Sequence, residues 1–212
     1  GKVADGNTIS DYDKEEIKRQ FSISTTMVPI EYEGAEGKIK INLLDTPGYF
    51  DFVGEVEEAV SAADAAIIVV NCKAGIEVGT EKAWDLCEEY KLPRIIFVTN
   101  MDDDHASFRE LILKLEKKFG RKIAPFQVPI RENEKFVGFV NAVKMQGRRF
   151  TNLSDYEDCE IPEYTKKNLG IIRDALIEAV AETSEEYMER YFSGEEFTQD
   201  EIYTCLLYTS PS

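Results

Sequence analysis

One turn in the chain has the residue types that phosphate sensing needs. Asp45-Thr46-Pro47-Gly48 follows a run of apolar residues, so Asp45 places a carboxylate at the carboxyl end of a predicted strand. Ligands of α/β folds bind at that edge of the sheet, and glycine lets its backbone N–H approach a phosphate closely. A carboxylate there can also hold Mg²⁺. The same four residues form ordinary turns as well, so the surrounding sequence must decide between the two interpretations.

Strands and helices alternate around this turn. A predicted hairpin comes before it, with strands at residues 27–32 and 39–44. The predicted elements after it are a helix at 52–63, a strand at 65–70, a helix at 81–90, a strand at 94–98 and a helix at 106–119. The first of these strands is apolar on both faces, as buried strands are, and Gly120 can end the last helix. This order predicts an α/β fold with a mostly parallel sheet.

The pattern changes after Pro125. We predict paired strands at residues 136–145, a polar loop at 151–160, an amphipathic helix at 169–181 and a last helix that begins at Thr198. Thr198 and Glu201 have the spacing of a capping box. We therefore place a subdomain boundary near Ile130.

Composition limits the classes of partner. The chain has 212 residues, of which 41 are acidic and 25 basic, and its formal net charge is -16. That charge disfavours non-specific binding to phosphate backbones, so we expect protein partners rather than naked nucleic acid. No apolar run approaches the ~20 residues that a membrane helix needs. The four cysteines have no C-x-x-C spacing, which indicates neither a zinc site nor a disulfide framework and favours a reducing cytoplasm.

Both ends of the sequence have features of a cut rather than of a natural terminus. Residue 1 is glycine, and no basic and apolar signal segment follows it, so we expect the natural start to lie upstream. Residues 205–212, C-L-L-Y-T-S-P-S, resemble the translation of a sequencing adapter, and we expect them to be an artefact.

The turn continues as Y-F-D-F over residues 49–52, and here the sequence resembles the translational GTPases, above all elongation factor G and its divergent second form. In that family the pattern is D-T-P-G-H-x-D-F. Upstream, residues 19–24, R-Q-F-S-I-S, resemble the family's first switch. The resemblance implies that the hydroxyl of Ser22 ligates Mg²⁺, that Asp45 binds the same ion through water, and that Gly48 and its turn sense the γ-phosphate.

Residues 97–102, F-V-T-N-M-D, lie where the family has F-V-N-K-M-D, whose aspartate accepts hydrogen bonds from N1 and N2 of guanine. In the ungapped register Asp102 is that residue, Thr99 replaces the asparagine and Asn100 replaces the lysine that lies over the base. A register shifted by one residue, N-M-D-D, restores Asn and Asp at the family's spacing and makes Asp103 the reader. We prefer the first register. The acidic run also suits the start of a helix, because carboxylates there interact favourably with the helix dipole.

Two departures from the family bear on the chemistry. The phosphate-binding loop G-x-x-x-x-G-K-[ST] is not found, and we expect it upstream of Gly1, so this segment alone should bind nucleotide weakly or not at all and be inactive. Tyr49 stands where the family has a histidine that positions the attacking water. A phenol does not take up a proton at neutral pH, although its O–H can orient a water. His105 lies in an acidic segment and is expected at the surface rather than as a replacement base.

The resemblance implies a P-loop GTPase-type three-layer α/β sandwich with an inserted α+β subdomain. Residues 1–129 would be the partial GTP-binding domain, and residues 130–204 the insertion, which in the family contacts the ribosomal stalk protein. The implied function is ribosome-dependent hydrolysis of GTP to GDP, with Mg²⁺ as cofactor, coupled to translocation or a related ribosomal step. The alternatives are a non-hydrolysing, nucleotide-gated module that binds the ribosome, and a factor of the ribosomal-protection type.

Overall fold

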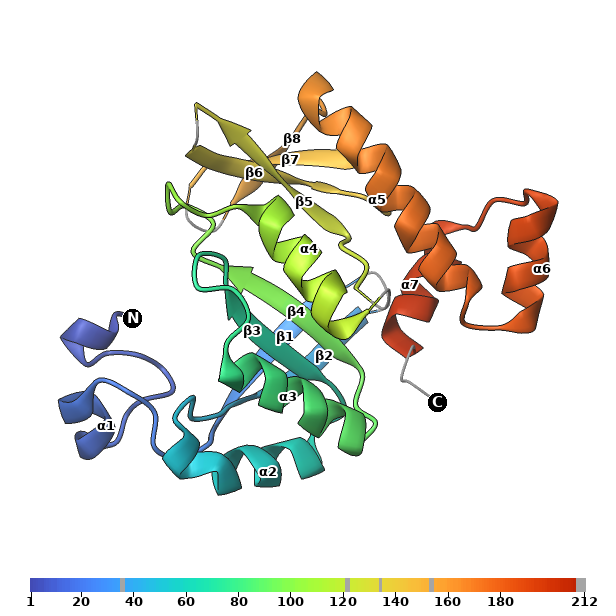
Figure 1. Cartoon of the computed structure of the whole chain (residues 1–212). Helices are drawn as coiled ribbons and strands as arrows, with labels where there is room; N and C mark the ends of the chain where they lie inside the picture. The colour runs from blue at the N-terminus through green and yellow to red at the C-terminus, as the bar shows by residue number, and fades with distance from the viewer. Residues whose placement is uncertain (35–36, 121–122, 134, 153–154, 209–212) are drawn as a thin grey trace. The chain divides into compact units, whose positions relative to one another are not determined.

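The computed structural model describes residues 1–34, 37–120, 123–133, 135–152 and 155–208 (Figure 1). The chain forms two compact units. The first contains residues Gly1–Ile68 and Val78–Ile95, and the second contains Val69–Glu77 and Ile96–Pro211. None of the described helices is both long and apolar enough to span a membrane.

The first unit is built around the predicted hairpin. Its helices and strands are η1 (Val3–Asp5), α1 (Lys14–Arg19), β1 (Thr26–Gly34), β2 (Gly37–Asp45), η2 (Phe50–Phe52), α2 (Val53–Ala62) and α3 (Val78–Glu89). β1 and β2 pair in antiparallel register, with Thr26 opposite Asp45, and the predicted turn residues 35–36 lie outside the described part of the chain. This register brings the start of β1 beside the carboxyl end of β2. The segment before Thr26 therefore ends next to the D-T-P-G turn.

Strands β3 (Ala66–Asn71) and β4 (Arg94–Thr99) form a second pair. The N–H of Ala66 donates to the carbonyl of Pro93 at 2.9 Å, and the N–H of Cys72 donates to the carbonyl of Thr99 at 3.0 Å. From the first bond to the second, the residue numbers increase along both strands, which is the pattern of parallel strands.

Strand β3, predicted as a strand that is apolar on both faces, is buried on only one of them. Ile68 and Val70 of β3 are 4% and 1% exposed, whereas Ile67 and Val69 are 57% and 60% exposed. An unbroken apolar run does not reveal which faces are covered, because coverage depends on what packs there. The mostly parallel sheet stays a prediction, since the other described strand pairs are antiparallel.

The second unit contains an antiparallel sheet and a group of helices. Its elements are α4 (Phe108–Phe119), β5 (Gln127–Glu132), β6 (Lys135–Asn141), β7 (Gln146–Phe150), β8 (Tyr156–Cys159), α5 (Glu163–Ala181), α6 (Glu185–Ser193) and α7 (Gln199–Tyr208). The strand order is β5-β6-β7-β8. The predicted stripe on α5 packs as core: Leu169 joins a cluster with the sheet residues Val128 and Val140, and Leu176 joins one with Ile202 of α7.

Two predictions for this unit need correction. The polar loop expected at residues 151–160 contains strand β8, which pairs with β7 so that Arg148 faces Asp158 and Arg149 faces Glu157. Opposite charges across a strand pair stabilise it, which explains a strand without an apolar pattern. Helix α5 begins at Glu163, directly after Pro162, rather than at residue 169. The boundary expected near Ile130 falls inside β5, and the domain division stays a prediction.

The predicted capping box is confirmed at the start of α7. The N–H of Thr198 donates to the carboxylate of Glu201 at 2.8 Å, and the N–H of Glu201 donates to the hydroxyl of Thr198 at 3.3 Å. Cys205 on the same helix is buried. The tail expected to be an artefact, 205–212, thus begins inside α7, and its last four residues, 209–212, lie outside the described residues, so this assignment stays a prediction.

Arg190 of α6 joins this helix to α7 through charge-assisted hydrogen bonds. Its Nη1 donates to Oε1 of Glu201 at 2.6 Å and its Nη2 to Oε2 at 3.3 Å, while Nε lies 3.2 Å from Oε1 of Glu195. The guanidinium also lies over the rings of Tyr187 and Phe197. The hydrogen bonds from Arg190, followed by that from the Thr198 N–H, lower the pKa of Glu201 from 4.5 to about 2.

This pKa predicts an acid-sensitive attachment of α7. Because the pKa of Glu201 is lower in the folded state than in the unfolded state, the stabilisation is complete above about pH 4.5 and is lost as the pH falls towards about 2. We expect Glu201→Gln to lower the urea midpoint at pH 6 and to have a smaller effect at pH 3, where part of the stabilisation is already lost, measured by circular dichroism. Glu196→Gln, which removes an exposed charge nearby, should have little effect at either pH. An equal effect of Glu201→Gln at both pH values would contradict the pairing.

Candidate functional site

The D-T-P-G turn leaves β2 with its functional atoms accessible. The carboxylate of Asp45 is half-buried and, among the described residues, has no hydrogen-bond or ion-pair partner. Pro47 is buried and fixes the turn, whereas Gly48 and Tyr49 are exposed. A Cβ added to Gly48 would meet no heavy atom within 4 Å, so the space beside this glycine is open. An exposed glycine beside an available carboxylate is compatible with the sensing of a phosphate and its metal ion.

The predicted metal ligand Ser22 lies in a segment that α1 holds in place. Its hydroxyl donates to Oδ1 of Asp11 at 2.7 Å rather than meeting Asp45. Directly after Ser22, the N–H groups of Ile23 and Ser24 both donate to Oε1 of Glu16, at 2.9 and 3.2 Å. The other oxygen of Glu16 accepts from the N–H of Asp13 at 3.2 Å. Glu16 is only 3% exposed, so its charge is stabilised by these backbone donors.

Hydrogen bonds and aromatic contacts join the Ser22 segment to the region after the D-T-P-G turn. The N–H of Thr25 donates to Oε2 of Glu55 at 2.6 Å, and the Thr25 hydroxyl donates to the Glu55 carbonyl at 3.1 Å. The ring of Phe21 contacts that of Tyr49 in a tilted arrangement, with centroids 4.6 Å apart, and its centroid lies 6.4 Å from that of Phe52. The two segments that sequence analysis assigned to Mg²⁺ and to the γ-phosphate are therefore mechanically connected through side chains.

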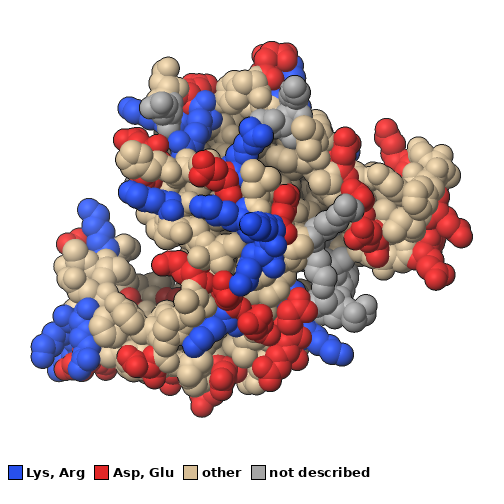
Figure 2. Space-filling view, viewed as in Figure 1, with Lys and Arg blue, Asp and Glu red and all other residues tan. Residues whose placement is uncertain are grey.

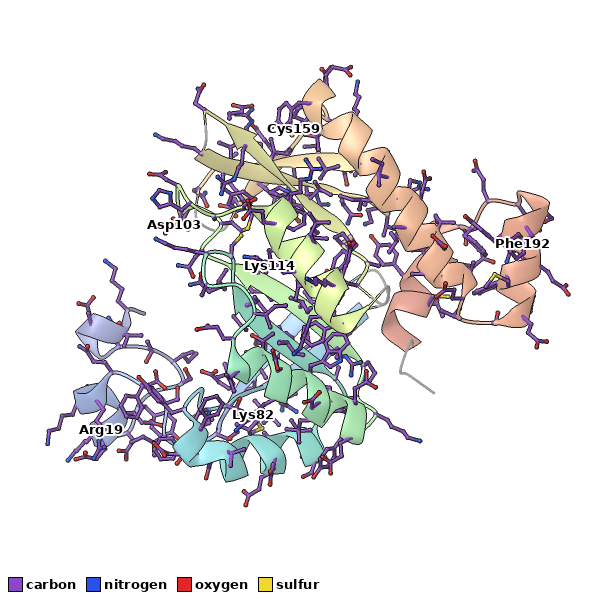
Figure 3. The ribbon with its side chains drawn as sticks, viewed as in Figure 1. Arg19, Lys82, Asp103, Lys114, Cys159 and Phe192 are labelled. Atoms are coloured by element: carbon purple, nitrogen blue, oxygen red, sulfur yellow. The ribbon has the colours of Figure 1, made fainter. Side chains whose placement is uncertain are left out.

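Helix α3 supports the far side of the turn. Nζ of Lys82, labelled in Figure 3, lies 4.3 Å from the centroid of the Phe50 ring. A cation over an aromatic face is attractive, by about 0.5–1 kcal/mol at an exposed site. Helices α2 and α3 also pack against each other. The residues that follow Tyr49 are thus held both by the segment after α1 and by α3.

The donor set of the first unit is compatible with Mg²⁺. Hydroxyl and carboxylate oxygens, which Mg²⁺ prefers, are supplied by Ser22, Asp11 and Asp45. Within the described part of the chain there is no group of three or more His, Cys, Asp or Glu residues suited to a metal. A magnesium ion here would depend on nucleotide phosphates and water for most of its ligands, as Mg²⁺ sites in phosphoryl-transfer proteins do.

The predicted guanine segment lies in the second unit, at the end of β4. Thr99 is the last strand residue, and Asn100 turns the backbone in a left-handed conformation, with φ 55°. The side-chain amide of Asn71 donates to the side-chain oxygen of Asn100 at 3.1 Å. Asp102 is exposed, and its carboxylate makes no hydrogen bond or ion pair with any described residue. It is therefore available to a ligand.

Asp103, the reader in the shifted register and labelled in Figure 3, already has hydrogen-bond partners. Its Oδ1 accepts from the N–H of His105 at 2.8 Å, and its Oδ2 accepts from Nζ of Lys73 at 3.0 Å. These bonds, first that from the backbone of His105 and then that from Lys73, lower the pKa of Asp103. His105 itself is exposed, as expected.

The sequence matches a known family over nearly its whole length. The family model of the elongation factor Tu GTP binding domain matches residues 1–198. The chain belongs to this family. Within it, the chain is 35% identical over 196 residues to an elongation factor G-like protein of Thermotoga maritima, covering 92% of this chain and 27% of the relative. It is 35% identical over 204 residues to elongation factor G of Thermotoga petrophila, covering 95% and 29%.

A solved structure supports the same conclusion. A crystal structure of a Thermus thermophilus protein superposes with a TM-score of 0.88 at 33% identity, covering 97% of this chain and 30% of that one. The resemblance to an elongation factor G-like translational GTPase is thereby confirmed, and with it the P-loop GTPase α/β fold. The chain spans under a third of the length of these relatives of the elongation factor GTP-binding family.

Sequence reasoning missed three residues that organise these segments of the GTP-binding domain: Glu16, Glu55 and Arg131. Asp13 and Glu16 have capping-box spacing, which was a readable signal, and the structure has that box. Glu55 and Arg131 lie about 30 positions from the backbone groups that they bind, and no local pattern identifies such contacts.

We expect Glu16 to control the order of the Ser22 segment. Ile23 is half-buried and Ser24 is exposed, and Glu16→Ala removes the acceptor of both N–H groups, at a cost of about 1.5–3 kcal/mol for a hydrogen bond to a charged group. Amide exchange at these two residues, measured by NMR or mass spectrometry, should accelerate at least about tenfold. The control is Glu15→Ala on the same helix, whose exposed ion pair with Arg19 contributes little. Unchanged exchange in Glu16→Ala would refute this role.

Proposed function

We propose that the full-length protein binds GTP and GDP with Mg²⁺ and hydrolyses GTP in a ribosome-dependent manner, coupled to translocation or a related ribosomal step. The observation that carries the proposal is the carboxylate of Asp102, which is exposed and has no partner among the described residues, while hydrogen bonds hold Asn100, Met101 and Asp103 around it. A fixed acceptor of this kind suits the paired N1 and N2 donors of guanine. The matched family and its relatives, elongation factors by name, support the same activity.

In this proposal Ser22 and Asp45 serve Mg²⁺, the aspartate through a water molecule, and the turn Thr46 to Gly48 contacts the γ-phosphate. The ion neutralises charge on the phosphates when it is bound. Ser22 must exchange its hydrogen bond with Asp11 for the ion, so nucleotide binding is expected to rearrange the segment before β1. Thr99 and Asn100 support the base site from the end of β4.

The two registers of the guanine segment make opposite predictions. Asp103 already accepts hydrogen bonds from Lys73 and from the His105 backbone, which favours Asp102 as the guanine reader. Asn at the reading position donates to the C2 oxygen of xanthine but repels the N2 donors of guanine. We therefore expect Asp102→Asn to weaken GDP binding by about a hundredfold and to improve XDP binding.

Fluorescent-nucleotide competition on the full-length protein measures both affinities. Asp104→Asn, which neutralises an exposed neighbour, is the matched control and should change neither. If Asp103→Asn rather than Asp102→Asn exchanges the preference, the shifted register is correct. If no variant does so, Asp residues of this segment do not read the base.

Tyr49 supports a second candidate, a nucleotide-gated module that binds the ribosome without efficient turnover. Its ring is 57% exposed and lies against Phe21, and a phenol offers no base for the attacking water. If the protein hydrolyses GTP, the phenol O–H can only orient that water. The role of this side chain therefore distinguishes a GTP-hydrolysing protein from a module that only binds the nucleotide.

Phosphate release with and without ribosomes separates the two candidates. We expect the wild type to release phosphate in a ribosome-dependent manner, and Tyr49→Phe to be at least about tenfold slower because the orienting O–H is lost. Tyr49→His should be as fast as the wild type or faster. Release only from Tyr49→His would support the non-hydrolysing module, and equal rates in all three proteins would mean that position 49 plays no chemical part.

The partners follow from the same proposal. The ribosome is the expected partner in the cytoplasm, and the inserted subdomain is the expected contact for the ribosomal stalk protein. Acidic side chains gather on α6 (Figure 2), namely Glu185, Glu186 and Glu189, beside the 79% exposed ring of Phe192. Such a surface suits a basic protein partner better than a nucleic acid.

A further inference from the structure

Arg131 reaches the guanine segment from strand β5. Its Nη2 donates to the backbone carbonyls of Met101 and Asp103, with a distance of 3.4 Å in the second case. These two residues flank Asp102 in the chain. One guanidinium group therefore holds the backbone on both sides of the proposed guanine reader.

Arg131 is itself held by a second element. The hydroxyl of Tyr164 on α5 accepts a hydrogen bond from the N–H of Arg131 at 3.1 Å and donates one to the Arg131 carbonyl at 2.7 Å. The backbone of Arg131 thus has a fixed anchor on the first turn of α5. A side chain that starts from a fixed backbone loses less freedom when it binds the loop.

The remaining supports of the loop leave Asp102 free. Asn71 binds Asn100 and Lys73 binds Asp103. Arg131 binds the backbone carbonyls of Met101 and Asp103. Asp102 is exposed and has no partner among the described residues. The arrangement fixes the backbone and keeps the carboxylate available, which is how a preorganised recognition group is built.

We propose that Arg131 is a positioning residue for base recognition, setting the selectivity of the site for guanine through the backbone around Asp102. The proposal rests on the proposed role of Asp102. Asn100 replaces the lysine that, by the resemblance, lies over the base. Selectivity for guanine therefore depends more on the orientation of Asp102 than in family members that have the lysine. Arg131 thereby connects β5 to nucleotide choice.

The test compares GDP with IDP, which lacks only the 2-amino group that Asp102 is expected to bind. In the full-length protein, Arg131→Ala removes charge-assisted hydrogen bonds and should weaken GDP binding by about tenfold. It should also reduce the ratio of GDP to IDP affinity by at least about threefold, because a displaced carboxylate meets N1 and N2 less well. Arg131→Lys, which can reach one carbonyl, should restore part of both losses. Tyr164→Phe should produce a smaller change in the same direction.

The matched control is Arg149→Ala on β7 of the same sheet, which removes an ion pair with Glu132 and should leave the GDP to IDP ratio unchanged. Faster amide exchange at residues 101–105 in Arg131→Ala with an unchanged ratio would overturn the proposal and leave Arg131 a purely structural residue. If Asp102→Asn exchanges the preference from GDP to XDP but Arg131→Ala leaves the ratio of GDP to IDP affinity unchanged, only the role of Arg131 is refuted. Failure of Asp102→Asn would refute the proposed reader first.

Discussion

A buried carboxylate must be surrounded by hydrogen-bond donors, and Glu16 meets this requirement with backbone N–H groups rather than with a cation. The consequence extends along the chain. The path of residues 23–24 is tied to α1, and Thr25 next to them is tied to Glu55, so the segment enters β1 in a set direction. Thr26 then pairs opposite Asp45. The position of the D-T-P-G turn relative to Ser22 depends on this sequence of backbone contacts.

In the second unit a charged side chain also binds backbone groups, but donor and acceptor are exchanged. There the groups that need partners are carbonyls, and Arg131 supplies N–H donors to two of them. In both places a charged side chain from another element fixes backbone groups and leaves a nearby carboxylate without a competing partner. Sites built in this way lose little order when a ligand arrives, because their geometry exists beforehand.

The sequence predicted those features that local patterns encode. Alternation and apolar runs identified β1, β2, β3 and β4, helical spacing identified α2 to α4, and the Thr198 capping box identified the start of α7. Strand β8 was missed because its acidic residues are stabilised by arginines on β7, which no local pattern reveals. The D-T-P-G turn and the guanine segment were found by motif and resemblance. Their supports, Glu55 and Arg131, act over long separations and needed the structure.

The acidic residues that made β8 hard to recognise in the sequence also affect whether the antiparallel sheet of the second unit can pair with strands of other molecules. Among the described strands, β8 and β5 form the two edges of this sheet. An exposed edge invites a strand of another molecule to pair with it and begin aggregation. β8 carries Glu157 and Asp158, and β5 carries Pro129, which has no N–H to offer. Both edge strands therefore pair poorly with strands of other molecules. This protects the sheet against aggregation at high protein concentration.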